Sequence, residues 1–311
     1  MRQFLVRRLI QSALLLWVLM TFTFVLVRLT PGGPEAALME QRNIQRADLE
    51  RMRERFGLND PLPIAYGKWL ASAVRLDFGR SYHYLQPPTE VIQGRLWPSI
   101  QLGAAAYLIA LCGVPLGMFA ALNRGKLPDL IVRVFTVLGD ATPTWWTGLV
   151  IIVVLSTTTG WFPQGQGRDG PLDWLKHIIV PAMILGLGGL VAFTRYVRSQ
   201  VLEVLGQDHV RTARAKGLIE FAVVNRHVLR NALLPVVTLL GGLFPALVSG
   251  AALTEGIFNW PGMGRLYLEA ASTRDYPLLL AIITLLTIVT LLGTLMADIL
   301  YGVVDPRIRY S

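Results

Sequence analysis

The sequence predicts an all-helical membrane protein that crosses the bilayer six times. Its 311 residues have a mean hydropathy of +0.49, and only 16% of them are charged, whereas soluble domains carry about 25% charged residues. Apolar stretches near the roughly 20 residues needed to cross a bilayer recur six times along the chain. Basic residues concentrate in every second connection between them. Together, these observations predict a polytopic, all-α fold.

The same composition excludes several other classes of protein. A chain that is 53% hydrophobic is neither intrinsically disordered nor collagen-like. The single cysteine, Cys112, excludes an internal disulfide and any metal cluster built on cysteines. A net charge of +9 and an isoelectric point near 10.0 leave two explanations open, nucleic acid binding or basic loops of a membrane protein. The distribution of charge along the chain decides between them.

Each predicted span follows from the lack of charge over its length. The six stretches are Leu9–Val27, Pro98–Asn123, Val134–Trp161, Ile178–Thr194, Asn231–Thr254 and Tyr276–Ala297. Only the third contains a charge, that of Asp140. The first has basic flanks like a signal peptide, but no small-residue cleavage site follows it, so we expect a retained span. Prolines and glycines inside the spans, including Pro143, predict kinks and close helix contacts.

The charge of the loops predicts the orientation in the membrane. The N-terminus, the second and fourth loops and the C-terminal end together hold 15 basic and 6 acidic residues, a net charge of +9. The other three loops hold 14 basic and 13 acidic residues. Because Lys and Arg in short loops stay on the cytoplasmic side, both termini are predicted to be cytoplasmic. The positive charge is therefore a signal of topology, and nucleic acid binding is excluded.

No linker, internal repeat or low-complexity segment divides the chain. We expect an N-terminal tail and first span over residues 1–27 and a long extracytoplasmic loop over residues 28–97. Within that loop, Glu35–Phe56 has apolar residues at helical spacing, which predicts a small helical cap over the mouths of the spans. The remaining spans form a core over residues 98–311, which includes a cytoplasmic loop over residues 195–231.

Motifs of enzymes are missing from the sequence. There is no Gly-rich loop ending in Gly-Lys-Ser/Thr that would hold ATP, and no Gly-x-Ser-x-Gly nucleophile motif. The four histidines lie in different segments without the spacing of a zinc site; they are His83, His177, His209 and His227. A membrane-embedded hydrolase would need a buried nucleophile and base that the sequence does not offer. We therefore expect a transport protein with no metal or cofactor of its own.

Asp140 is the one acidic residue deep within a predicted span. Carriers driven by protons or sodium usually place several acidic residues there. Asp140 either contacts the translocation path or lies near a helix start close to the interface, where it caps the helix or hydrogen-bonds locally. A secondary transporter or channel that works without ATP remains the alternative to an ATP-driven transporter.

The most informative cytoplasmic segment runs from Gly206 to Gly217. Its polar ends predict a short helix with Asp208 near its N-terminus and Gly217 as its C-terminal stop. The small side chains of Ala213 and Ala215 would let another surface come close. The alternative is a basic loop that only follows the positive-inside rule.

This segment resembles the EAA loop of ABC importer permeases. Val210–Gly217, followed by Arg226-His227 and by Arg230–Pro235, is similar to the oligopeptide, dipeptide and nickel branch of that family, although Arg211-Thr212-Ala213 stands where the family has its glutamate. Further segments resemble the same branch in order along nearly the whole chain: Leu29–Pro34 (with Gly33 in place of an acidic residue), Gly57–Pro61, Tyr66–Leu70, Leu76–Ser81, Arg95–Ser99, Glu255–Leu266, Arg274–Pro277 and Asp305–Tyr310. The long outer loop matches the first permease of the pair.

The resemblance implies the type I ABC importer permease fold and a position in the bacterial or archaeal cytoplasmic membrane. It implies a second homologous permease subunit, two ATP-binding subunits that hold ATP and Mg, and an extracytoplasmic substrate-binding protein. This chain would move di- or oligopeptides; nickel chelates, glutathione or sugars are the alternatives. The residues that would couple to the ATPase are Asp208, His209, Val210, Arg211, Thr212, Ala213, Arg214, Ala215, Lys216 and Gly217.

Two further groups of residues follow from the resemblance. The outer loop between spans five and six either reaches towards the substrate or binding protein, or forms a re-entrant turn held by Trp260 and Pro261; its candidates are Glu255, Phe258, Trp260, Pro261 and Gly262. The candidates for the translocation path are Asp140, Thr144, Trp145, Gly242, Pro245 and Ser249. Small residues such as Gly242 are also what helix packing alone selects, and tryptophans also serve at interfaces.

Overall fold

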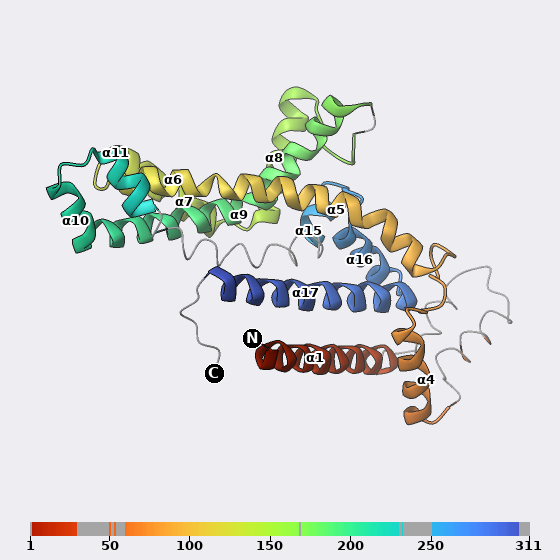
Figure 1. The fold of residues 1–311 in the computed structure, drawn as a ribbon. Helices are drawn as coiled ribbons and strands as arrows, with labels where there is room; N and C mark the ends of the chain where they lie inside the picture. The colour runs from red at the N-terminus through yellow and green to blue at the C-terminus, as the bar shows by residue number, and fades with distance from the viewer. Residues whose placement is uncertain are drawn as a thin grey trace.

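The computed structural model shows an elongated bundle of helices (Figure 1). It describes residues 2–29, 60–167, 169–229 and 251–304, together with residues 50, 53 and 232. Within these residues, four helices are long and apolar enough to cross a membrane, and a bent pair of helices brings the number to as many as five. The all-helical membrane fold predicted from composition is therefore confirmed.

The described helices differ widely in length. The helices long enough to cross a membrane are α1 (Arg2–Leu29), α5 (Pro88–Leu111) continued by α6 (Gly113–Leu122), α9 (Pro171–Leu205) and α17 (Tyr276–Val304). The shorter elements are α4 (Leu62–Val74), α7 (Leu127–Ala141), α8 (Thr144–Thr159), α10 (Asp208–Ala215), α11 (Glu220–Ala222), a π-helix η1 (Val223–Leu229), α15 (Ala252–Ile257) and α16 (Met263–Ser272). The end of the bundle that carries α10 lies opposite the end that carries α4 (Figure 1).

The centre of the bundle is the packing of α5 and α6 against α9. Glycines make this approach possible, because a Cβ atom at Gly113 or Gly117 would clash with the backbone of α9. From the other side, a Cβ atom at Gly186 of α9 would clash with the backbone of α5. Gly113 and Gly117 are spaced as in the Gly-x-x-x-Gly pattern that brings membrane helices together. The close contact predicted from the glycines is confirmed here.

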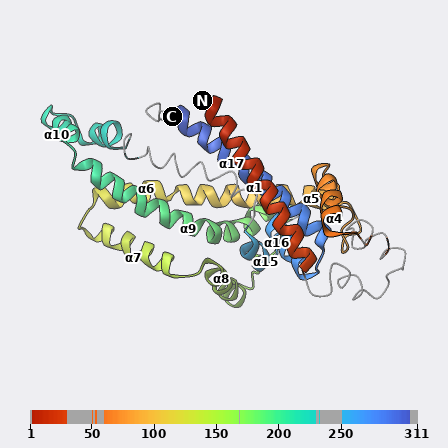
Figure 2. The same cartoon turned by 90° about the horizontal axis from the view of Figure 1, so that it is seen from below.

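The first and last helices pack side by side at one flank of the bundle (Figures 1 and 2). Phe24 of α1, Trp69 of α4 and Leu280 of α17 belong to one buried apolar cluster. The indole of Trp69 lies 5.1 Å from the ring of Phe24, measured between centroids. Thus α4, which lies within the predicted outer loop, closes this end of the α1–α17 pair.

Several predicted spans differ from the helices in length. The second begins ten residues before its predicted start, since α5 begins at Pro88, inside the predicted outer loop. The fourth is the 35-residue α9, which extends to Leu205 and therefore includes the start of the predicted cytoplasmic loop. A helix of this length measures about 50 Å, more than the roughly 30 Å of the hydrocarbon core. Most of the predicted fifth span and of the Glu35–Phe56 cap lies outside the described residues.

The predicted third span over residues 134–161 is divided between two helices, α7 and α8, and the kink predicted at Pro143 is confirmed. The chain turns by 100° between α7 and α8. Thr142 has an extended backbone, with φ −101° and ψ 124°, and Pro143 follows it. A proline disfavours the helical conformation of the residue before it, so α7 ends at Ala141 and α8 begins in a new direction.

Candidate functional site

The short helix α10 has well-defined ends. Asp208 lies in its first turn and Arg214 in its last, where each charge is opposite in sign to the helix dipole. After the helix, Gly217 adopts φ +76°. Its backbone N–H donates to the carbonyl of Arg214 at 2.9 Å, and the N–H of Leu218 donates to the carbonyl of Ala213 at 3.4 Å. These two bonds form a Schellman motif, so the predicted helix and its glycine stop are confirmed.

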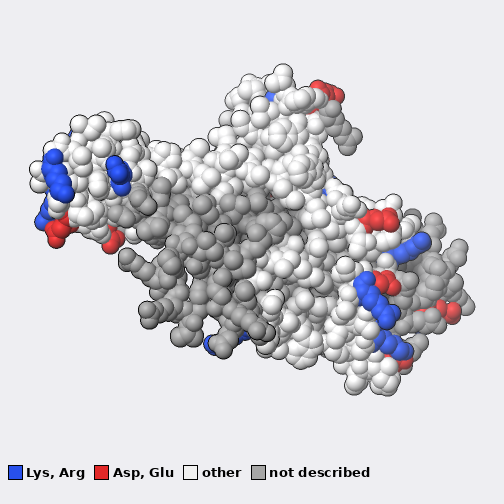
Figure 3. All heavy atoms as spheres, viewed as in Figure 1, with Lys and Arg blue, Asp and Glu red and all other residues white. Residues whose placement is uncertain are grey.

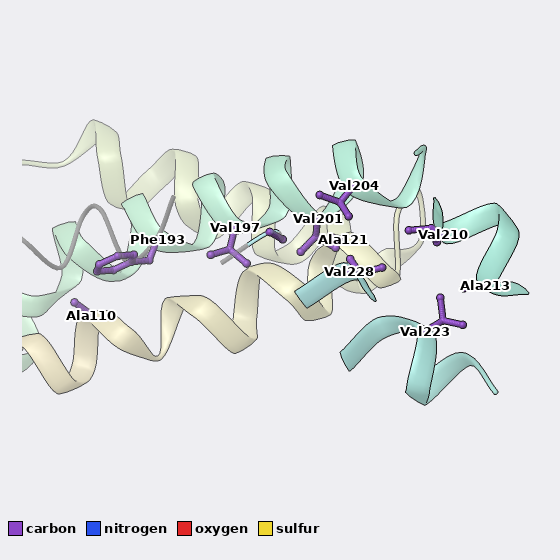
Figure 4. Close-up of a cluster of buried hydrophobic side chains, with 11 residues drawn as sticks. Ala110, Ala121, Phe193, Val197, Val201, Val204, Val210, Ala213, Val223 and Val228 are labelled. Atoms are coloured by element: carbon purple, nitrogen blue, oxygen red, sulfur yellow. The ribbon is translucent and has the colours of Figure 1, made fainter. Parts of the chain in front are cut away.

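One face of α10 is buried against the rest of the chain. Val210 is 0% exposed and Ala213 is 4% exposed. Both belong to an apolar cluster at the end of α9 (Figure 4), which also contains Ala121, Val201, Val204, Val223 and Val228. The expectation that Ala213 offers its small side chain to another surface therefore does not hold, because that side chain packs within the chain. Ala215, which was predicted in the same role, is exposed.

The opposite face of α10 is exposed and polar. Its exposed residues are Asp208, His209, Arg211, Thr212, Arg214, Ala215, Lys216 and Gly217. The Arg214 guanidinium binds both oxygens of Glu220, with its Nε 3.1 Å and its Nη2 2.6 Å away. This hydrogen bond lowers the pKa of the Glu220 carboxyl below its ordinary value and raises the pKa of Arg214. The pair ties α10 to α11, which begins at Glu220.

Two ion pairs connect α7 to α9 near this end. Arg198 donates to the buried carboxylate of Asp129, which is 1% exposed, and Arg195 donates to Asp140 at 2.8 Å. Asp140 is the second-to-last residue of α7, so the prediction that it lies near a helix start is wrong. The side chains of Asp140 and Arg195 are about half exposed.

The candidate path residues are only partly within the described chain. Thr144 is half-buried and Trp145 is exposed, both in the first turn of α8. Gly242, Pro245 and Ser249 lie outside the described residues. A path along Asp140, Thr144 and Trp145 stays a prediction.

Three of the predicted outer-loop residues are buried in the interior of the bundle. Glu255 and Trp260 are 0% exposed and Phe258 is 1% exposed. The Glu255 carboxylate accepts from Ser99 Oγ at 2.8 Å and from the backbone N–H of Arg265 at 3.0 Å. Trp260 Nε1 donates to the carbonyl of Pro98 at 2.9 Å.

This geometry gives the loop a structural role. Pro261 is half-buried and Gly262 is buried, with no room for a Cβ atom beside the Glu255 carboxylate. The loop is thus fixed by hydrogen bonds to Pro98 and Ser99, near the middle of α5. Of the two alternatives, the hydrogen bond of Trp260 agrees with a turn held by Trp260 and Pro261.

A second buried carboxylate, missed in the sequence, lies at the start of α17. Asp275 is 0% exposed and precedes α17, where it accepts the backbone N–H of Leu278 at 3.3 Å as an N-cap. It also accepts from Ser81 Oγ and from the backbone N–H of His83. The outer loop before α5 is therefore anchored to the start of the last span. Within the described residues, no group of three His, Cys, Asp or Glu side chains is arranged to hold a metal ion.

Comparison with known proteins decides the family. Residues 113–310 match the model of the binding-protein-dependent transport system inner membrane component, and residues 1–91 match the N-terminal model of the same transport systems. The chain belongs to this family of ABC importer permeases. It is therefore a multi-pass inner membrane permease and a transport component, not itself a catalyst.

Individual relatives cover the whole permease. It is 38% identical over 317 residues to the oligopeptide transport system permease protein AppB of Bacillus subtilis, with 100% of both chains covered. It is 39% identical over 322 residues to a Brucella ovis protein named as a peptide permease, again with 100% of both chains covered. A solved chain of the MetNI methionine ABC transporter, in an inward-facing conformation, shares the fold, with a TM-score of 0.55 at 17% identity over 70% of this permease and 98% of that chain.

Sequence reasoning located α10 but missed the partners of the buried carboxylates. Asp129 and Arg198 are 69 residues apart, and Ser99 and Glu255 are 156 residues apart. A signal existed for the second pair, because both residues lie in segments that resemble the family. The structure shows that these two segments contact each other.

Proposed function

We propose that this permease is the first membrane subunit of an ATP-driven importer of di- or oligopeptides. The support comes from its full-length similarity to proteins named as oligopeptide and peptide permeases. In such an importer an extracytoplasmic binding protein delivers the peptide. The chain forms the path together with a second homologous permease. Two ATPase subunits bind ATP and Mg and supply the energy.

The α10 end of the bundle is assigned to the cytoplasm, with both termini on the same side. The excess of basic residues in the connections at this end supports that orientation. On the face drawn in Figure 3, charged atoms of the described residues lie mainly at the α10 end and at the opposite end, around α4. Because α9 continues for ten residues past Arg195, α10 lies about 15 Å beyond the first charge that follows the apolar part of this helix. That distance supports the assignment of α10 to the surface that a cytoplasmic protein would contact.

The role assigned to α10 is to dock on one ATPase subunit and transmit its movement. The observation that carries this assignment is the division of α10 into two faces. Val210 and Ala213 hold it to the end of α9, while the polar face with Arg211 is exposed. A docked α10 would therefore move together with α9, since their contact is a buried apolar cluster. The turn at Gly217 and the Arg214–Glu220 pair fix the direction in which the chain continues from α10 to α11.

The test uses the assembled transporter in liposomes, with binding protein and labelled di- and oligopeptides outside and ATP supplied to the ATPase subunits. We expect uptake to require ATP. Arg211→Glu reverses a charge on the exposed face of α10 and is expected to reduce uptake and recovery of the ATPase subunits with the permease at least tenfold. Arg124→Glu, at an exposed position in the connection between α6 and α7, is the matched control and is expected to change both less than twofold.

Three results would contradict the proposal, each in a different part. Uptake that needs an ion gradient and not ATP would identify a secondary transporter. Normal uptake and normal ATPase recovery with Arg211→Glu would show that the exposed face of α10 is not the docking surface. Failure of peptides to be taken up, with uptake of nickel chelates, glutathione or sugars instead, would change only the substrate.

A further inference from the structure

The ion pair between the buried Asp129 and the partly buried Arg198 is held by several hydrogen bonds. Arg198 Nε donates to Oδ1 of Asp129 at 2.7 Å, and its Nη2 donates to Oδ2 at 2.9 Å. The backbone N–H of Gly125 donates to Oδ2 as well, at 3.1 Å. The Nε of Arg133, one turn along α7, lies 3.6 Å from the same oxygen. The Asp129 side chain is 1% exposed.

These hydrogen bonds fix the orientation of the two side chains as well as the distance between them. An arginine that binds a carboxylate through two parallel hydrogen bonds has one favourable orientation, which an apolar contact of the same size lacks. Burying the two charges costs desolvation energy that their attraction only partly returns, so a buried ion pair is weak evidence for stability. The geometry of Asp129 and Arg198 therefore points to a role in position rather than in stability alone.

The pair lies at a junction of three elements. Gly125 belongs to the turn after α6, Asp129 to the first turn of α7, and Arg198 to α9, seven residues before its end. Just beyond Arg198, Val201 and Val204 enter the apolar cluster that holds α10 (Figure 4). The part of α9 that carries α10 is thus the part to which α7 is bonded.

We propose that Asp129 and Arg198 are positioning residues for coupling, which make α7 move with the end of α9 that carries α10. This inference rests on the proposed function, because it concerns the path by which movement of α10 reaches the membrane. Without the pair, α9 would still follow α10 through the apolar cluster. The helices α7 and α8, which meet at a turn of 100°, would no longer move together with α9. ATP would then be hydrolysed with less transport.

The chain contains a matched control on the same two helices. Asp140 and Arg195 also join α7 to α9, at 2.8 Å, but their side chains are 55% and 49% exposed. Exposed pairs hold two side chains only loosely. If any bond between α7 and α9 were sufficient, both pairs would matter equally; the proposal assigns the role to the buried pair alone.

The experiment measures peptides imported per ATP hydrolysed by the complete transporter in liposomes. Three variants alter the pair. Asp129→Asn keeps the shape of the side chain and removes its charge, whereas Arg198→Lys keeps the charge and removes the two parallel hydrogen bonds of the guanidinium. The double variant D129L/R198M replaces the pair by apolar side chains. We expect each to lower the peptide-to-ATP ratio at least fivefold, and Arg195→Gln, which breaks the exposed pair from the α9 side, to change it less than twofold. The double variant is informative because apolar replacement of a buried pair often keeps or raises stability. We expect it to unfold at or above the temperature of the unmodified transporter and still to be poorly coupled.

Each other outcome overturns the proposal. A normal ratio in assembled D129L/R198M or Arg198→Lys would show that the bidentate pair does not position α7 for coupling. Loss of assembly in all three variants, with Arg195→Gln assembling normally, would assign the pair to folding alone. These failures leave ATP-driven uptake by the unmodified transporter intact, whereas uptake without ATP would overturn the proposed function and this inference together.

Discussion

Replacing Gly186 by alanine tests whether the contact between α5 and α9 determines the stability of the bundle. A Cβ atom at Gly186 would lie 3.0 Å from the Cβ of Ile109 on α5, and closer still to the carbonyl oxygen of Ala106. Carbon atoms prefer a separation of about 3.5–4.0 Å, so the two helices must separate by about 0.5–1 Å. Gly188 lies on the same helix, two residues away, and nothing stands within 4 Å of its added Cβ.

The magnitude follows from two opposing effects. Alanine is favoured over glycine inside a helix by about 0.8–1.0 kcal/mol, and this gain applies to both positions. Adding a methyl group to a tightly packed contact costs about 1–3 kcal/mol, and this cost applies to Gly186 alone. We therefore expect Gly188→Ala to leave stability unchanged or raise it by up to about 1 kcal/mol, and Gly186→Ala to lie about 1–3 kcal/mol below it.

The assay is thermal unfolding of both variants in the same lipid nanodiscs, followed by tryptophan fluorescence. We expect the midpoint of Gly186→Ala to lie several degrees below that of Gly188→Ala. Equal midpoints would refute the reasoning, since the two variants make the same chemical change in the same helix. A lower midpoint for Gly188→Ala would show that its surroundings are occupied by a partner and not open.

Three further predictions use the same measurement. Trp260→Phe removes the hydrogen bond to the Pro98 carbonyl and is expected to cost about 1–3 kcal/mol; no loss would mean that this bond contributes nothing. Ala213→Arg forces a charge into the cluster below α10 and should lower the midpoint well below that of Ala215→Arg, at an exposed position on the same helix. Because Arg214 lowers the pKa of Glu220, their pair stabilises the fold above the ordinary pKa of 4.5 and loses this effect as the pH falls through the lowered value. Glu220→Gln should cost at most about 1 kcal/mol at pH 7, since the pair is exposed, and should remove that pH dependence.

What the sequence could predict depended on how local the signal was. The spans follow from uncharged stretches, and α10 follows from Asp208 and Gly217, which act within one or two turns. The two faces of α10 were also available, because Val210 and Ala213 are three residues apart and share one side of a helix. The sequence predicts a break before α8, since Pro143 restricts the residue before it. The angle of 100° depends on packing that hydropathy does not describe.

The pairing of distant polar groups was beyond sequence reasoning. Nothing local to Asp129 or Arg198 indicates that they meet, and their burial is decided by how α7 lies on α9. The segments that resemble the family gave a weak hint. Ser81 and Asp275 lie in two of these segments, and the structure joins them by a hydrogen bond. The resemblance thus reflects contacts between elements as well as surfaces that would meet partners.

The arrangement of contacts along α9 explains why one short helix can influence a large part of the bundle. Near its middle, Gly186 brings its backbone against α5. Further along, Arg195 and Arg198 bind α7, and in its last two turns Val201 and Val204 bury the inner face of α10. These contacts lie on one continuous helix, so displacement of α10 is not absorbed by a flexible loop before it reaches α5 and α7. Ser199→Pro, at an exposed position of α9 between Arg198 and Val201, would kink the helix between the residues that bind α7 and those that hold α10, and it should uncouple ATP hydrolysis from transport while α10 still docks.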